Sequence, residues 1–359
     1  MLKQFTAFVF LVTVCFQGSS QTVKLKLTEH TANIEAIAYS PNGQYFVSSG
    51  WDGAVNLYTI DSMGLPKFKQ SFLGHLGAVT SLNFSKNSRY IISCGKDYSA
   101  RVWNIDTPNL SKVFSLHFEP VTCAFLDQSG KFLITSSTDG TIKTTSVSDS
   151  KKSKTIKVGK SISDLLLSKD NKYYYASVKG GTIMKIETGS TKIIEEMTGH
   201  KDEVNALDIS PDGRILASAG NDKVIILWDL TTGKELRKLN GFEWKVTSVE
   251  FSADGKYVIG GCNEGTTKLF DAETGKLVSD FKESSKNVRD VAFNNNGTQI
   301  AIATNLDGDR FGAVIYSSGV TAGKPEPGAG KGKTPVKPGA AKPAATTPSA
   351  KPKSPTAKK

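Results

Sequence analysis

The chain has 359 residues, of which 38% are hydrophobic and 22% charged, so it carries enough apolar side chains for a folded core. Its formal net charge is +11, but the segment after Ser318 holds nine lysines against one glutamate and supplies +8 of that charge. The basic character therefore belongs to one segment, which excludes a folded surface that is basic all over.

Residues 1–20 have the composition of a secretory signal peptide. Lys3 precedes an apolar run at residues 5–16, and small residues follow up to Ser20. The run is shorter than the roughly 20 residues that a membrane-spanning helix needs. We therefore predict cleavage after Ser20 and a secreted or periplasmic protein, with an uncleaved anchor as the alternative and no lipid anchor at Cys15.

From Val23 onward the chain repeats one pattern about seven times. Each copy has an alternating apolar stretch, a turn with glycine, a second apolar stretch, a turn aspartate and then an aromatic residue. His75 and His117 mark a period of 42 residues, which is typical of four-stranded propeller blades. In six copies 18 positions separate the leading aliphatic residue from the turn residue: Ile34 and Asp52, Val79 and Asp97, Val121 and Asp139, Ile162 and Gly180, Val204 and Asp222, and Val246 and Glu264.

The alternation and the turns predict a chain made almost entirely of strands. Apolar stretches of four to eight residues are typical of strands. Pro41-Asn42-Gly43, Pro211-Asp212-Gly213 and Ala253-Asp254-Gly255 separate such stretches and predict hairpin turns, because these residue types tolerate positive φ.

Residues 199–230, GHKDEVNALDISPDGRILASAGNDKVIILWDL, resemble the consensus of the WD-repeat (WD40) family. The resemblance extends from Val23 to about Ser318. It implies an all-β fold, a seven-bladed β-propeller over residues 21–318 that is closed by an N-terminal strand at 23–27. Together with the N-terminal segment, it suggests a secreted or periplasmic, bacterial-type member. An intracellular eukaryotic-type scaffold is the alternative, and it requires the N-terminal apolar segment to be something other than a signal.

In similar proteins a His, a Ser or Thr, the turn Asp and a Trp form a hydrogen-bonded chain inside a blade. The resemblance places this chain at His75, Ser93, Asp97 and Trp103, and again at His200, Ser218, Asp222 and Trp228. All four histidines of the sequence occupy this structural position, so none remains for a catalytic triad or a zinc site. We therefore predict a protein that is not an enzyme and holds no metal or cofactor.

The family resemblance also nominates a face for binding a protein or peptide partner. In similar proteins partners dock on the loops that precede the first strand and the turn aspartate, which here gives Trp51, Glu35, Lys96, Lys179, Asn205, Asn221, Trp244, Lys245, Asn263 and Arg289. Trp51 stands out because aromatic residues dominate binding hot spots. The alternative is that Trp51 and Trp244 pack over loop backbone. We expect no specific nucleic-acid partner, and a monomer or a member of a complex.

A second class of function uses the centre of the ring. A propeller enzyme or small-ligand sensor would place its site in the central channel, and carboxylates converging there would favour it. Separately, Asn305, Asp307 and Asp309 alternate as in a calcium loop, but Arg310 stands where that loop needs glycine. A simple hairpin insertion is therefore the preferred interpretation, with calcium as the alternative.

Cys94, Cys123 and Cys262 fall in segments with strand-like patterns. We expect three buried thiols, because free cysteine is among the most often buried residues. A disulfide between Cys94 and Cys123 is the alternative.

Residues 319–359 have no aromatic residue and almost no aliphatic side chain larger than alanine. Such a segment cannot bury enough apolar surface to offset its ordering entropy, so we predict a disordered tail. Its lysines predict binding to an anionic envelope surface or polymer through counterion release. A solvated spacer is the alternative.

Overall fold

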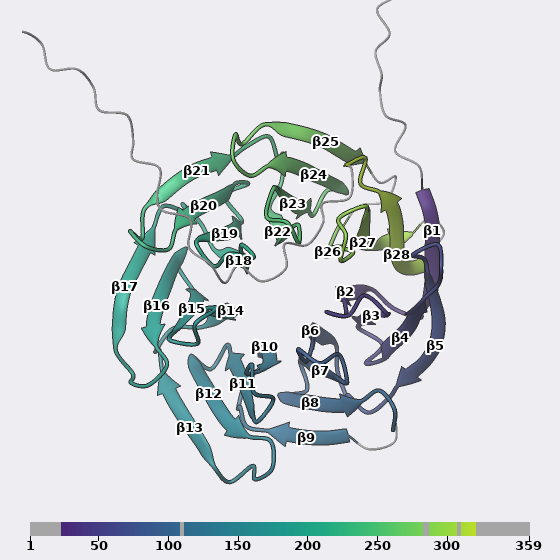
Figure 1. The fold of residues 1–359 in the computed structure, drawn as a ribbon. Coiled ribbons are helices and arrows are strands. Elements are labelled where there is room, and N and C mark those ends of the chain that lie inside the picture. Colours follow the sequence, from purple (N-terminus) through teal and green to yellow (C-terminus); the bar gives the residue numbers. More distant parts are fainter. Residues whose placement is uncertain (1–22, 108–110, 283–286, 307–309, 321–359) are drawn as a thin grey trace, which may run out of the picture. The chain divides into compact units, whose positions relative to one another are not determined.

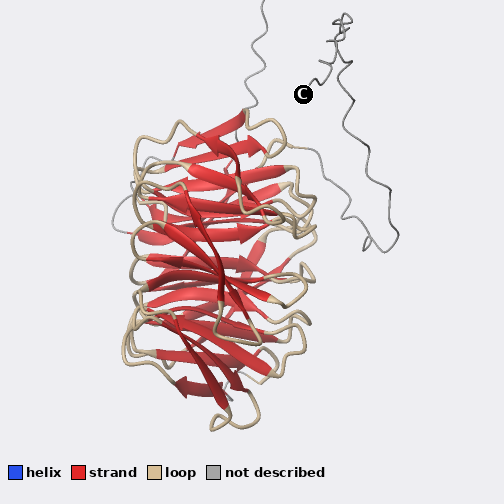
Figure 2. Cartoon of the chain, turned by 90° about the vertical axis from the view of Figure 1, so that its left-hand side faces the viewer, coloured by secondary structure: helices blue, strands red, loops and turns tan. Residues whose placement is uncertain are grey.

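The computed structural model describes residues 23–107, 111–282, 287–306 and 310–320. These residues form seven four-stranded antiparallel sheets, the blades of a propeller, arranged in a ring (Figure 1). The same region seen from the side consists of strands and loops (Figure 2). The predicted all-β, seven-bladed fold is confirmed.

Each blade runs from an innermost strand to an outermost one. The innermost strands are β2 (Ile34–Tyr39), β6 (Val79–Phe84), β10 (Val121–Leu126), β14 (Ile162–Leu167), β18 (Val204–Ile209), β22 (Val246–Phe251) and β26 (Asp290–Phe293). The second strands are β3 (Tyr45–Gly50), β7 (Tyr90–Gly95), β11 (Phe132–Ser137), β15 (Tyr173–Val178), β19 (Ile215–Gly220), β23 (Tyr257–Cys262) and β27 (Gln299–Leu306).

The third strands are β4 (Val55–Ile60), β8 (Ser99–Asn104), β12 (Thr141–Ser146), β16 (Thr182–Glu187), β20 (Ile225–Asp229), β24 (Thr266–Asp271) and β28 (Arg310–Ser317). The outermost strands are β5 (Pro66–Phe72), β9 (Ser111–Ser115), β13 (Ser153–Lys157), β17 (Ile193–Thr198), β21 (Glu235–Leu239), β25 (Leu277–Lys282) and β1 (Val23–His30). We number the blades 1 to 7, beginning with β2 to β5.

The ring closes through the predicted N-terminal strand. β1 pairs antiparallel with β28 and completes blade 7, with Leu27 opposite Ala313. Closure of this kind joins the two ends of the propeller in one sheet and leaves no blade incomplete. The observed strand continues to His30, three residues beyond the predicted segment.

The hairpins between the first and second strands follow the predicted turn chemistry. Gly43 has a φ of 70°, and the hydroxyl of Ser40 donates to Asn42 Oδ1 (2.7 Å) and accepts from the backbone N–H of Tyr45 (2.9 Å). The same serine contact recurs at Ser210 and Ser252. Because the turn is closed by its own side chains, these sequences specify the hairpin locally.

The hydrophobic core lies between neighbouring blades. One of its clusters joins Val47 and Phe72 of blade 1 to Ile91 and Trp103 of blade 2, all of them buried. Cys94, Cys123 and Cys262 are buried free thiols, so the alternative disulfide does not form. The described residues contain no helix long and apolar enough to cross a bilayer.

Several predictions lie outside the described residues. These are the signal peptide at 1–20, the disordered tail at 319–359 beyond Val320, and Asp307 and Asp309 of the calcium alternative. The domain boundaries at residues 20 and 318 therefore stay predictions.

The histidine network is built inside the blades. His75 Nε2 lies 2.7 Å from Ser93 Oγ, Nδ1 lies 2.8 Å from Asp97 Oδ2, and the indole N–H of Trp103 donates to Ser93 Oγ (2.8 Å). His200, Ser218, Asp222 and Trp228 have the same arrangement at 2.7 to 3.0 Å. With a neutral imidazole, the serine O–H donates to Nε2 and the Nδ1–H donates to the carboxylate, so every buried polar atom has a partner.

The charge state of the network follows from burial. Burial lowers the pKa of His75 below its usual value, against the opposing effect of Asp97. Burial also opposes ionisation of Asp97, but His75, Ser99 and the backbone N–H of Leu76 together hold the pKa of that carboxyl below its usual value. The pair is therefore a carboxylate beside a neutral imidazole at neutral pH.

Blade 3 offers a matched comparison, because it lacks the tryptophan. His117 Nε2 lies 2.8 Å from Thr135 Oγ1, and Thr145 stands in the aromatic position. We expect Ser93→Ala to leave His75 Nε2 and the indole nitrogen of Trp103 without partners and to lower the free energy of unfolding by about 3 kcal/mol. Thr135→Val leaves only His117 Nε2 without a partner, so its loss should be about half as large. Urea denaturation of both variants checks this; equal losses would contradict it.

Candidate functional site

One face of the ring, the loop face, carries the two sets of loops named by the sequence. One set joins each outermost strand to the next blade, and the other joins second to third strands. The backbone N–H of Trp51 donates to Asn33 O (2.8 Å), and that of Lys96 donates to Ala78 O (2.9 Å). These bonds, together with the histidine–aspartate pairs, hold the two loops of a blade side by side.

Two of the predicted partner-binding residues, Glu35 and Lys96, contact Trp51, and a third, Arg289, lies beside Glu35. The indole N–H of Trp51 donates to the carboxylate of Glu35, and Lys96 Nζ lies 4.7 Å from the centre of the indole. Arg289 Nε lies 4.0 Å from Glu35 Oε1. This Trp51 cluster joins blades 7, 1 and 2, and its tryptophan remains 48% exposed. The indole ring of Trp51 is thus fixed by contacts with Glu35 and Lys96 and is still exposed to solvent.

Two strongly exposed apolar residues were missed by the sequence reasoning. Leu76 is 93% exposed and Phe118 is 86% exposed. Each directly follows the histidine of its blade, and its backbone N–H donates to the turn aspartate. The sequence indicates their exposure by an apolar residue directly after the histidine, where two other blades have the polar residues Thr31 and Lys201.

The remaining predicted residues do not join the Trp51 cluster. Trp244 is half exposed beside Lys223, whose Nζ lies 6.0 Å from the ring centre, and the described residues show no contact between Trp244 and Trp51. Asn205 donates to Asn221 Oδ1 (2.9 Å) and to Val246 O (2.8 Å), so it braces blade 5 against blade 6.

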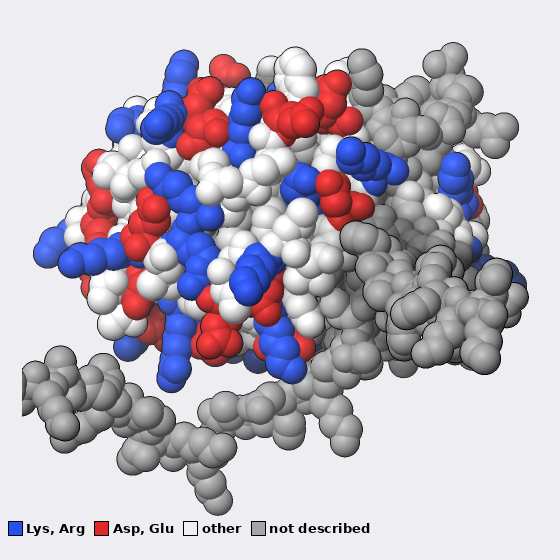
Figure 3. All heavy atoms as spheres, turned by 90° about the horizontal axis from the view of Figure 1, so that it is seen from above, with Lys and Arg blue, Asp and Glu red and all other residues white. Residues whose placement is uncertain are grey.

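Lys179 and Lys245 are exposed and Asn263 is half-buried, all on the loop face. Their binding roles stay predictions. The side of the ring seen in Figure 3 carries acidic and basic side chains interspersed, so charge does not single out one patch there.

A second group of functional candidates lines the centre of the ring. Asp164, Asp208, Glu250 and Asp290 stand on the innermost strands of blades 4 to 7. Each carboxylate accepts a backbone N–H from the innermost strand of the next blade: Asp164 from Leu207 (2.8 Å), Asp208 from Phe251 (2.6 Å), Glu250 from Phe293 (2.7 Å) and Asp290 from Ile37 (2.9 Å). These bonds fasten four consecutive junctions between blades.

Burial changes the acidity of these groups. It raises the pKa of Asp208 and of Asp290 to about 6, and it raises the pKa of Asp164. Burial, with the negative charge of Asp208, raises the pKa of Glu250 well above its usual value. The hydrogen bonds from backbone N–H groups act in the opposite direction but do not cancel the cost of burial.

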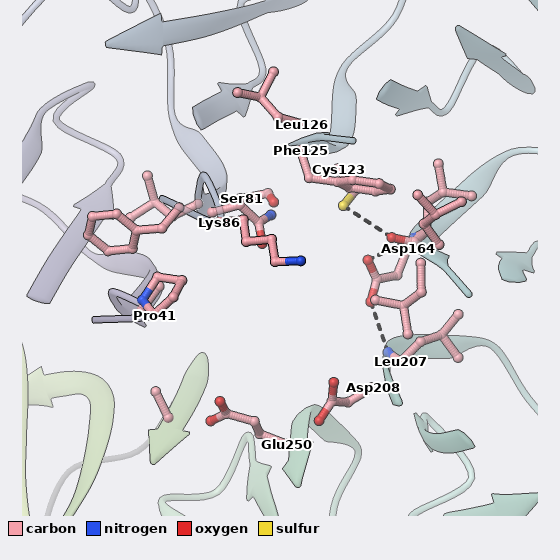
Figure 4. A pocket seen from close by; sticks show the side chains of 18 of the residues that line it. Pro41, Ser81, Lys86, Cys123, Phe125, Leu126, Asp164, Leu207, Asp208 and Glu250 are labelled. Atoms are coloured by element: carbon pink, nitrogen blue, oxygen red, sulfur yellow. Dashed lines mark hydrogen bonds between the residues drawn. The ribbon is translucent and has the colours of Figure 1, made fainter. Parts of the chain in front are cut away.

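The carboxylates border a cavity of about 690 Å³ at the centre of the ring. In Figure 4 the side chains of Asp208 and Glu250 lie close together on one wall, while Lys86 reaches in from the opposite wall. Within the described ranges no three His, Cys, Asp or Glu side chains are grouped so that they could hold a metal ion. Carboxylates in the central channel are the feature that would favour the alternative function, a propeller enzyme or small-ligand sensor.

Comparison with known proteins identifies the repeats. Residues 20–59, 66–104, 108–144 and 191–229 match the family model "WD domain, G-beta repeat". Residues 240–296 match "Anaphase-promoting complex subunit 4 WD40 domain".

Three relatives illustrate the range of similar proteins. U3 small nucleolar RNA-associated protein 21 homolog of Schizosaccharomyces pombe is 30% identical over 119 residues, which are 33% of this chain and 13% of the relative. WD repeat-containing protein SL1-17 of Schistosoma mansoni is 34% identical over 116 residues, 32% of this chain and 37% of the relative. Small ribosomal subunit protein RACK1 of Medicago sativa is 49% identical over 45 residues, 12% of this chain and 14% of the relative. The matched segments thus span well under half of each relative.

The relatives overturn the predicted secreted or periplasmic location. Their names associate them with a small nucleolar RNA and with the small ribosomal subunit, which are intracellular, and their sources are eukaryotic. The prediction was wrong because it rested on a mostly apolar run of twelve residues after a lysine, a composition that does not by itself determine location. Nothing supports a bacterial-type member either.

The raised pKa of Asp208 predicts a pH dependence of stability. Its ordinary pKa is 3.8 and its folded pKa is about 6, so the folded state holds a proton that the unfolded state has released between these values. We therefore compare the free energy of unfolding of the native chain with that of Asp208→Asn. The native value minus the variant value should fall by about 2 kcal/mol as pH rises from 4 to 6, because the slope approaches about 1.4 kcal/mol per unit only between the two pKa values.

Denaturation of both proteins at pH steps from 4 to 8 checks this, with the loop variant Asp202→Asn as control. A difference that grows as pH rises would show that the pKa of Asp208 is depressed, which contradicts the expectation.

Proposed function

We propose that this chain, which is built of WD40 repeats closed into a seven-bladed propeller, is a non-catalytic scaffold whose loop face binds a protein or peptide partner. The observation that carries the proposal is the Trp51 cluster with the exposed side chains of Leu76 and Phe118 in the neighbouring blades.

The apolar residues supply the driving force. Leu76 and Phe118 are almost fully exposed, and burying such a side chain contributes about 1.5–3 kcal/mol. Trp51 is held by Glu35 and Lys96, so little rotamer entropy is lost when a partner covers it. Rigid aromatic anchors of this kind are typical of hot spots.

The charged residues of the cluster suggest the chemistry of the partner. Lys96 lies over Trp51, and Arg289 Nε is buried without a hydrogen-bond partner. A segment with apolar side chains beside a carboxylate would pair with the Lys96 ammonium and cover the aromatic ring, while Arg289 already lies beside Glu35. Two of the relatives are named for RNA-containing assemblies, which supports a scaffold role in a larger complex without identifying the partner.

The lysine-rich segment after Ser318 has a second proposed role. Nine lysines against one glutamate suit an anionic surface or polymer, and binding of that kind weakens steeply with salt. It would add non-specific affinity to a partner selected by the loop face.

Substitutions on the loop face test the scaffold. We expect Trp51→Ala and Phe118→Asp each to weaken binding of a captured partner by about 10- to 100-fold, equivalent to about 1.4–2.8 kcal/mol. Met63→Asp is the matched control, because Met63 is exposed in the turn between β4 and β5 on the opposite face. Binding is measured by titrating the purified partner into each variant.

A chain ending at Ser318 separates the two roles. Loss of binding only in this truncated chain, together with binding by the full chain that salt abolishes, would assign the partner to the lysine-rich segment. Unchanged affinity in both loop-face variants would refute the proposal for the loop face.

A further inference from the structure

The central cavity is not used by the proposed scaffold. Its lining includes Pro41, Lys86, Gln128 and Lys169 from the hairpin turns between first and second strands, so it opens away from the loop face. We call it the turn-side cavity. At about 690 Å³ it has the size of a small-molecule site.

The inner wall of this cavity is acidic. Asp164, Asp208, Glu250 and Asp290 all line it. Glu250 uses only Oε2 to accept the N–H of Phe293, and Asp208 uses one oxygen for each of two backbone N–H groups. Carboxylate oxygens can accept more than one hydrogen bond, so this wall retains capacity to accept from a ligand.

An unpartnered hydroxyl lies in the same lining. The hydroxyl of Tyr39 is buried and has no hydrogen-bond partner among the described residues. Its pKa is raised by burial and then by the negative charge of Glu250, which places the hydroxyl within electrostatic reach of that carboxyl. A buried polar group without a partner is costly, and a bound polar ligand is one way to satisfy it.

The spacing of the carboxylates decides which kind of cation fits. No three of the described carboxylates, histidines or cysteines are close enough to hold a metal ion. The acidic groups are instead spread over four blades, with the apolar side chains of Phe84, Phe125 and Leu126 elsewhere in the lining. A matching ligand therefore needs N–H donors separated by a hydrocarbon chain.

We propose that the turn-side cavity binds a small linear diamine or polyamine, with one ammonium group between Asp208 and Glu250 and the methylene chain against Phe125 and Leu126. The Tyr39 hydroxyl accepts from the same ammonium group. Lys86, which reaches into the cavity from the opposite wall, competes with the ligand as an internal cation.

Calorimetric titration of the full chain with putrescine and with spermidine tests the proposal. We expect saturable one-site binding, weakened at least tenfold in Glu250→Gln and several-fold in Tyr39→Phe, and tightened in Lys86→Ala. Glu273→Gln is the matched control: Glu273 is exposed in the turn after β24 and outside the cavity lining, so its substitution should leave the affinity unchanged.

Two results would overturn the inference. One is the absence of saturable binding of either amine to the native chain. The other is an equal effect of Glu250→Gln and Glu273→Gln, which would mean general attraction to acidic surface. If Glu250→Gln does not fold, the variants Lys86→Ala and Tyr39→Phe provide the test. Lys86 is exposed and Tyr39→Phe removes a single oxygen atom, so both variants should fold. Unchanged affinity in both would contradict the proposed site.

Discussion

The constraint on which the structure depends is the free edge of each innermost strand. In a ring of blades this edge faces the centre, where no further strand can pair with it, yet its N–H and C=O groups are too buried to be left unsatisfied. Four carboxylates meet this demand at the junctions from blade 4 round to blade 1, for example Asp290 to Ile37. Elsewhere a neutral side chain does so, as where Asn83 donates to Ala124 O across blades 2 and 3.

This solution places acidic groups where they are hard to ionise. Asp208 and Asp290, with pKa values of about 6, are mostly ionised at neutral pH, whereas burial raises the pKa of Glu250 well above its usual value. In the proposed amine site, the groups that join the blades also supply acceptor oxygens for the ammonium group. The loop face is separate: its contacts fix Trp51 and leave the apolar side chains of Leu76 and Phe118 exposed. The same propeller thus has exposed apolar side chains on its loop face and carboxyl groups in the lining of its central cavity.

The fold could be predicted because its signals are local and repeated. The turn chemistry at Ser40 to Tyr45 and the register from Val79 to Asp97 are each contained within one blade, and closure by β1 followed from the resemblance. Asp208 and Glu250 could not be placed, because a single acidic residue in a strand acquires its partner only when the ring brings the next blade alongside. Phe118 was missed because the exposure of one side chain after a loop histidine depends on tertiary structure. The location was wrong because an apolar run carries little information.

The most direct test of this account is backbone amide hydrogen exchange at Ile37, Leu207, Phe251 and Phe293 in the native chain. These N–H groups point away from the paired strand of their own blade and donate to carboxylates of the preceding blade. If the carboxylates fasten the blades, these amides should be protected as strongly as the amides that pair innermost with second strands. Exchange as fast as that of amides in the exposed hairpin turns would show that the inner edge is open to water, and would contradict the account.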